Sequence, residues 1–132
     1  MGQKIKGYIF DIGNVLVKWN PSNIIDKYLS KDKLNYTELN QVTSEMNLEI
    51  DKGQDFKTII GEYIKRYPIF EQVLIDWRDN WIDMFQPKIS GTWVIMNELK
   101  NMGHPVFALS NFGQDTFKIA CSYYPELKYF NK

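Results

Sequence analysis

The sequence has few of the features that mark secreted, membrane-spanning or nucleic-acid-binding proteins. Cys121 is the only cysteine, so no disulfide can form within the chain, and a reducing compartment is favoured. No apolar run approaches the roughly 20 residues of a transmembrane helix, and the N-terminus lacks the pattern of a signal peptide. Sixteen basic residues balance sixteen acidic ones, which gives no electrostatic reason to expect a nucleic acid or a membrane surface as partner. We therefore expect a cytoplasmic protein without a membrane anchor.

What is present is the length and composition of one globular domain. The 132 residues are 44% hydrophobic and 15% aromatic, which is enough to build a core. Residues 5–10 contain a short apolar run that stops at Asp11, as is typical of a buried strand entering a tight loop. A second such run, residues 105–109, stops at Ser110. Because helical sequence separates the two runs, they favour a parallel pair of strands.

Helical periodicity dominates the rest of the chain. Between residues 20 and 86, apolar residues recur at helical spacing in four successive stretches, so we expect four amphipathic helices that pack as a small bundle. The spacing of the last stretch predicts a helix that continues to Phe85, just before Pro87. Two further helices are predicted over 90–102 and 114–124, one on each side of the second strand. The predicted fold class is α/β, with a helical insertion between the two strands.

Polar residues follow both predicted strands and are candidates for chemistry. In open α/β sheets a ligand site lies beyond the carboxyl ends of the strands, and Asp11 and Ser110 stand at those two ends. A carboxylate there can attack phosphorus or an alkyl carbon, while Ser110 and Asn111 can hold an oxygen of a phosphate or carboxylate. The spacing alone favours a simpler interpretation, in which Asp11 caps a turn and Asn111 or Gly113 supplies a positive φ.

Taken together, the two motifs resemble those of the haloacid dehalogenase (HAD) superfamily. IKGYIFDIGNVLVKWNP resembles its first motif, a hydrophobic strand with a nucleophilic Asp and a Gly-containing loop, and VFALSN resembles its second motif. MNLEIDKGQDF and ISGTWVIMNELKNMGHPVFALSNF resemble the branch that inserts a helical cap after the first motif. The resemblance implies a partial Rossmann-like HAD core over 1–17 and 87–132, parallel strands with flanking helices. It also implies a four-helix cap over 18–86 that closes over the site and selects the substrate.

The resemblance also implies roles for the residues around the two motifs. Asp11 would attack the substrate, and Ser110 would hold the transferred group. Asn111 and Asn14 would contact the substrate in the same pocket. Trp19 would either pack under the cap or form a wall of that pocket.

Mg²⁺ is the cofactor that the resemblance implies for a phosphatase. Its ligands would include the Asp11 carboxylate and the backbone carbonyl of Gly13, because Mg²⁺ prefers hard oxygen ligands. On the cap, Asp51 and Lys52 are candidate specificity contacts. Charged residues beside a glycine, here Gly53, are more often an ordinary solvated turn.

The chain departs from the family at two points. Phosphatases of the family usually carry a second Asp two positions after the nucleophile as general acid and base, whereas this chain has Gly13. The charge-neutralising Lys or Arg of the third motif and the acidic pair of the fourth motif have no counterpart between the second motif and Lys132. We therefore expect the N-terminal part of a HAD protein, with weak Mg²⁺ binding and impaired turnover. Such a chain would form a homo-oligomer or bind the missing C-terminal half.

The function expected from these observations is hydrolysis of a small phosphorylated metabolite through an aspartyl nucleophile. A 2-haloacid dehalogenase is the alternative within the family, and it would attack carbon without Mg²⁺. An alternative of a different class is a catalytically inactive module for binding or assembly, which the absence of the two late motifs favours.

Overall fold

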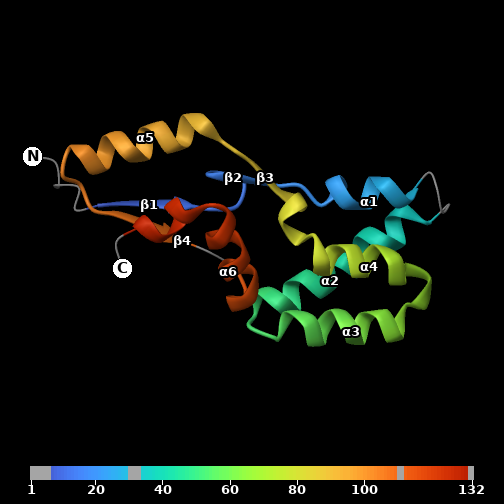
Figure 1. Cartoon of the computed structure of the whole chain (residues 1–132). Coiled ribbons are helices and arrows are strands. Elements are labelled where there is room, and N and C mark those ends of the chain that lie inside the picture. The colour runs from blue at the N-terminus through green and yellow to red at the C-terminus, as the bar shows by residue number, and fades with distance from the viewer. Residues whose placement is uncertain (1–6, 30–33, 110–111, 131–132) are drawn as a thin grey trace, which may run out of the picture.

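The computed structural model describes residues 7–29, 34–109 and 112–130 of the chain, which form a mixed α/β structure. Figure 1 shows a small sheet with helices at one end of the molecule and a group of helices at the other end. None of the helices within the described ranges is long and apolar enough to cross a membrane.

The sheet end is built on one pair of parallel strands. Strand β1 (Tyr8–Asp11) pairs with β4 (Val106–Leu109), and Asp11 stands opposite Leu109. The parallel pair predicted from the two apolar runs is confirmed. Helix α5 (Ser90–Asn101) precedes β4 and runs alongside the sheet (Figure 1), as a crossover between parallel strands requires.

Helix α6 and a 3₁₀ helix complete the sheet end of the molecule. Helix α6 (Gln114–Tyr123) follows β4 and lies toward the middle of the molecule in Figure 1, and the 3₁₀ helix η3 (Pro125–Tyr129) comes next. The Tyr124 hydroxyl, at the junction of these two helices, donates a hydrogen bond to the Phe85 carbonyl at 2.9 Å. This bond ties the C-terminal segment to the chain that returns from the helical end.

The four helices predicted between the strands are present, and we call them the helical unit. They are α1 (Ser22–Leu29), α2 (Tyr36–Asp51), α3 (Phe56–Arg66) and α4 (Glu71–Asp79), with the 3₁₀ helix η1 (Pro68–Phe70) before α4. Asn35 and Asp55 are the N-caps of α2 and α3, and their side chains accept hydrogen bonds from backbone N–H groups of the first turns. The buried apolar faces include Leu39, Ile60 and Trp77, so burial of one face holds each helix in place.

A second strand pair connects the sheet to the helical unit and was not predicted. Strand β2 (Val17–Trp19) pairs antiparallel with β3 (Phe85–Lys88), so the helical unit is inserted between two paired strands. The prediction that the fourth helix continues to Phe85 is wrong. Helix α4 ends at Asp79, and the 3₁₀ helix η2 (Trp81–Met84) leads into β3. The apolar spacing of this stretch fits a helix as well as it fits a strand. The strand forms because pairing with β2 gives the backbone of β3 hydrogen bonds that replace those of a helix.

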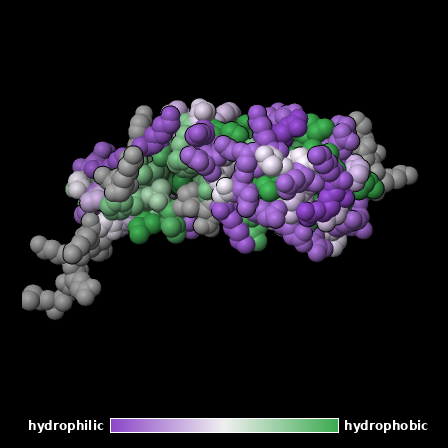
Figure 2. Space-filling model, turned by 90° about the horizontal axis from the view of Figure 1, so that it is seen from below, coloured by the Kyte–Doolittle hydropathy of each residue, from purple (hydrophilic) through white to green (hydrophobic). Residues whose placement is uncertain are grey.

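Apolar residues are unevenly distributed over the surface. In Figure 2 hydrophobic residues gather over the half of the visible face that carries the sheet, whereas the helical half is mainly hydrophilic. Ile9 in β1 is 71% exposed and Leu109 in β4 is 59% exposed. Parallel sheets are normally covered on both faces, so this exposure is unusual for strands of this kind.

Candidate functional site

The site predicted from the first motif lies at the carboxyl end of β1, where the chain turns tightly into β2. The backbone N–H of Val17 donates to the Ile12 carbonyl at 3.1 Å, and the N–H of Asn14 donates to the Val17 carbonyl at 2.7 Å. Ile12 and Val17 are buried, whereas Asp11, Gly13 and Asn14 are exposed. The apolar residues of the loop therefore anchor it in the core and leave its polar residues accessible.

Asn14 holds this loop in shape. Its φ of 63° lies in the left-handed region, which Asn adopts more readily than most residues. Its Oδ1 atom accepts a hydrogen bond from the backbone N–H of Trp19 at 2.9 Å. The side-chain NH₂ group is then the part of Asn14 that can be offered to a ligand.

Four of the residues predicted for the site line one cavity. Asp11, Gly13, Asn14 and Trp19 lie around a space of about 230 Å³. Drug-sized ligand sites usually enclose about 300–1,000 Å³, so this cavity suits a small metabolite. The remaining lining comes from α2, η2, β3, the end of β4 and α6, and it includes Asn47, Asp51, Trp81, Phe112 and Thr116. The cavity thus lies between the sheet end and the helical unit.

Asp51 brings a second carboxylate to the cavity from the end of α2. It is half-buried, and desolvation raises the pKa of its carboxyl group from 3.8 to about 6. The Nδ2 atom of Asn47 lies 3.4 Å from Asp51 Oδ2, a long hydrogen bond. Of the two predicted specificity contacts, Asp51 lines the cavity, whereas Lys52 is exposed and is not part of the lining.

Asn47 was not singled out from the sequence, although a signal for it exists. It precedes Asp51 by four residues, a spacing that places both side chains on one face of a helix. Thr116 was also missed. Its hydroxyl donates to the Gly113 carbonyl at 3.1 Å, so it resembles an ordinary polar residue in the first turn of a helix.

A close approach between α6 and α2 shapes one side of the cavity. A Cβ atom at Gly113, the N-cap of α6, would lie 2.5 Å from the carbonyl oxygen of Ile50, the residue before Asp51. Gly113 has a φ of −67°, so the interpretation in which it supplies a positive φ is wrong. Glycine is needed there for contact between two backbones. This contact brings the start of α6 close to the end of α2.

Aromatic rings form much of the apolar part of the lining. The Trp19 and Trp81 ring centroids lie 5.8 Å apart, and Trp19 also packs edge-on against Trp77 of α4 at 5.9 Å. Trp19 therefore packs against the helical unit and also lines the cavity. Trp81 is 3% exposed, and its indole N–H has no hydrogen-bond partner among the described residues.

Ser110 and Asn111 lie outside the described residues, and their roles stay predictions. The residues on either side of them, Leu109 and Phe112, both line the cavity.

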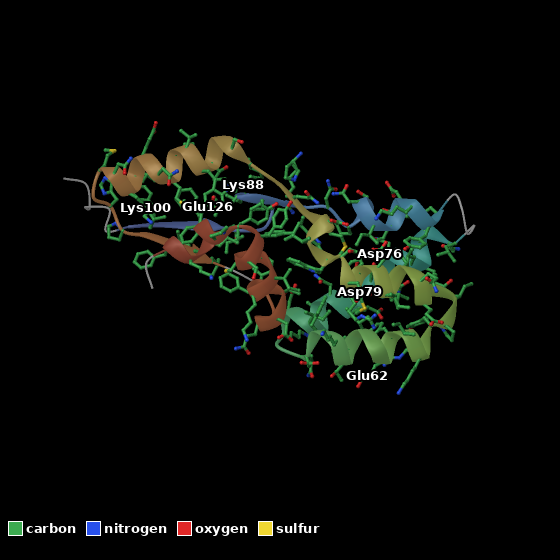
Figure 3. The ribbon with its side chains drawn as sticks, viewed as in Figure 1. Glu62, Asp76, Asp79, Lys88, Lys100 and Glu126 are labelled. Atoms are coloured by element: carbon green, nitrogen blue, oxygen red, sulfur yellow. The ribbon has the colours of Figure 1, made fainter. Side chains whose placement is uncertain are left out.

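The cavity lining carries negative charge without a compensating cation. Asp11 and Asp51 belong to it, whereas no Lys, Arg or His is among the described lining residues. Lys88 on β3 lies outside the lining and is paired with Glu126 at 2.7 Å (Figure 3). Such a site attracts cations and repels free anions.

The described residues can provide few ligands for a metal. No group of three or more His, Cys, Asp or Glu side chains that could hold a metal ion occurs in the part of the chain that the structure describes. A divalent cation at Asp11 would use the Asp11 carboxylate and the Gly13 carbonyl. The loop hydrogen bonds described above do not compete for the Gly13 carbonyl, because they use the carbonyls of Ile12 and Val17. Mg²⁺ tolerates such a site when water or ligand oxygens complete its shell.

No known protein-family model matches the chain, and comparisons with curated proteins and with solved structures find no match either. The function is therefore inferred from the residues of this site.

Proposed function

We propose that the chain belongs to the HAD lineage of hydrolases and acts on a small phosphorylated metabolite through Asp11. One observation carries the proposal. Asp11 lies at the carboxyl end of β1, beside the end of β4, and lines a cavity that also reaches Asp51 of the helical unit. In this proposal the two parallel strands with α5 and α6 are the partial HAD core, and the helical unit is its cap.

The chemistry would proceed in two displacement steps. A carboxylate oxygen of Asp11 attacks the phosphorus of a phosphate monoester, the bond from phosphorus to the alcohol oxygen breaks, and the alcohol takes up a proton. Water then hydrolyses the acyl phosphate on Asp11 and releases phosphate. Asp11 is exposed to the cavity, and no ion pair with it occurs among the described residues. Its carboxylate is therefore accessible to a substrate.

Mg²⁺ is the proposed cofactor, and its protein ligands would come from the end of β1 and the loop that follows it. The Asp11 carboxylate and the Gly13 carbonyl would hold it, and when bound it would neutralise part of the phosphate charge. Gly13 cannot donate a proton to the leaving alcohol. The described lining also has no cationic side chain to attract the phosphate, so we expect slow turnover.

Phosphoryl transfer to Asp11 is the direct test, because it does not require rapid turnover. The chain would be incubated with acetyl phosphate and Mg²⁺, and its intact mass measured. We expect one added phosphoryl group, lost in Asp11→Asn and kept in Asp26→Asn, which changes an exposed carboxylate on α1 outside the cavity lining.

Two outcomes would contradict the proposal. The first is an unmodified mass for the unsubstituted chain, and the second is equal labelling of the Asp11→Asn variant. Release of chloride from 2-chloropropionate without phosphoryl labelling would instead favour the dehalogenase alternative, in which the same carboxylate attacks carbon.

A further inference from the structure

The charge of the cavity restricts what can bind in it. Its described lining contains two carboxylates and no basic side chain. A phosphate monoester brings further negative charge. A ligand with a positive charge of its own would offset part of the repulsion.

Asp51 is the carboxylate best placed to meet such a charge. It is half-buried, and no Lys or Arg forms an ion pair with it among the described residues. Its one described side-chain partner is Asn47, through the long hydrogen bond of 3.4 Å. Burying a carboxylate without a cation costs free energy, and a bound ammonium group would recover it. Desolvation by burial raises the pKa of the Asp51 carboxyl group to about 6.

Trp19 adds an aromatic surface that favours organic cations over hydrated ones. Its indole ring lines the cavity, whereas Trp81 is 3% exposed and packs against Trp19 and Phe85, with ring centroids 5.8 and 5.3 Å apart. The faces of indole rings attract ammonium groups, and carboxylates with aromatic rings are the usual elements of such sites. Basic side chains lie over rings elsewhere in the molecule, such as Arg66 over Tyr63 at 4.9 Å. The Trp19 ring is not among the described rings covered in that way.

The position of Asp51 leaves room for an ammonium group. Asp51, Asn47 and Trp19 also line a second cavity of about 190 Å³, next to Trp77. Asp51 is therefore shared by two neighbouring cavities, of which only the first includes Asp11.

These observations rest on the proposed function and deepen it. We infer that the substrate is a phosphorylated amino alcohol whose ammonium group binds to the Asp51 carboxylate and the ring of Trp19. The phosphate then lies toward Asp11, and the cation toward the end of α2.

Choline is the probe for this site, because it carries the ammonium group without the phosphate. Its neutral isostere, 3,3-dimethylbutan-1-ol, has the same shape without the charge. Binding would be followed by intrinsic tryptophan fluorescence, since two of the four tryptophans line the cavity. We expect a saturable change with choline and none with the isostere at equal concentration.

Substitutions assign the response to Asp51. Asp51→Asn keeps the size of the side chain and should weaken choline binding about tenfold. Asp79→Asn is the matched control, because Asp79 is exposed on α4, pairs with Arg78 at 2.8 Å and does not line the cavity. Circular dichroism would verify that both variants are folded.

Three outcomes would overturn the inference. The first is an equal response to choline and to its isostere, and the second is unchanged choline binding in Asp51→Asn. The third is displacement of choline by Mg²⁺ in the unsubstituted chain but not in Asp51→Asn, which would make the carboxylate pair a metal site instead. The binding assay requires no catalysis. Choline binding without phosphoryl labelling of Asp11 would therefore reject the proposed function alone, and labelling without choline binding would reject this inference alone.

Discussion

Replacement of Gly113 by alanine should force α6 away from α2 at the side of the cavity. The added Cβ would lie 2.5 Å from the Ile50 carbonyl oxygen and 3.1 Å from Ile50 Cγ2, whereas ordinary contacts begin at 3.4 Å. The two elements must therefore separate by about 0.9 Å, the difference between 3.4 and 2.5 Å. The carbonyl cannot simply turn aside, because it accepts the Gly53 N–H at 3.0 Å at the end of α2. Overpacking of this kind costs about 1–3 kcal/mol.

Thermal and urea denaturation of matched glycine variants would measure this cost. For a chain of this length, each kcal/mol should shift the melting temperature by roughly 3–5 °C, so Gly113→Ala should melt roughly 3–15 °C lower. Gly61→Ala is the control. Gly61 lies inside α3, and a Cβ there would meet nothing within 4 Å. The control variant should gain about 0.5–1 kcal/mol from the higher helix propensity of alanine. If Gly113→Ala were as stable as the unsubstituted chain, or shifted in the same direction as Gly61→Ala, the contact between α6 and α2 would be refuted.

Three further predictions concern turnover, pH and local stability. Hydrolysis of p-nitrophenyl phosphate with Mg²⁺ should stay near background and rise in Gly13→Asp, because a Cβ atom at position 13 would meet nothing within 4 Å and the new carboxyl group would add an acid near Asp11. Adding Asp11→Asn should abolish the gain, and a gain that survives it would contradict the assigned role. Folding raises the pKa of Asp51, so this carboxyl group stabilises the fold when protonated and loses that contribution as the pH rises through about 6. In urea melts Asp51→Asn should therefore be more stable than the unsubstituted chain by about 1 kcal/mol above about pH 7, a value discounted for partial exposure, and the difference should vanish below about pH 4. Amide exchange should be slowest in α3 and α4 and faster in β1 and β4, since each of these strands pairs with one neighbour among the described residues. Slower exchange in the strands would contradict this and would point to an added partner for the sheet.

Local patterns in the sequence were sufficient to predict most of the elements. Contacts between residues three and four apart produce helices, so the apolar spacing predicted all four helices of the helical unit. The helix predicted over 90–102 corresponds to α5, and Gly103, just after it, has a φ of 87° that suits the end of a helix. The two apolar runs ending in polar residues predicted the parallel pair and placed Asp11 at its carboxyl end.

Contacts between distant parts of the chain determined the rest. Local spacing extended α4 to Phe85, because nothing near that residue shows that its backbone pairs with Trp19. Asp51 looked like one of several charges in a turn until α2 placed it at the cavity that holds Asp11. Gly113 looked like a turn residue, and its need for glycine comes from the Ile50 carbonyl, more than 60 positions earlier in the chain. The periodicity of helices and strands depends on residues close together in the chain, so the sequence shows it. Close packing between backbones depends on which distant segments meet.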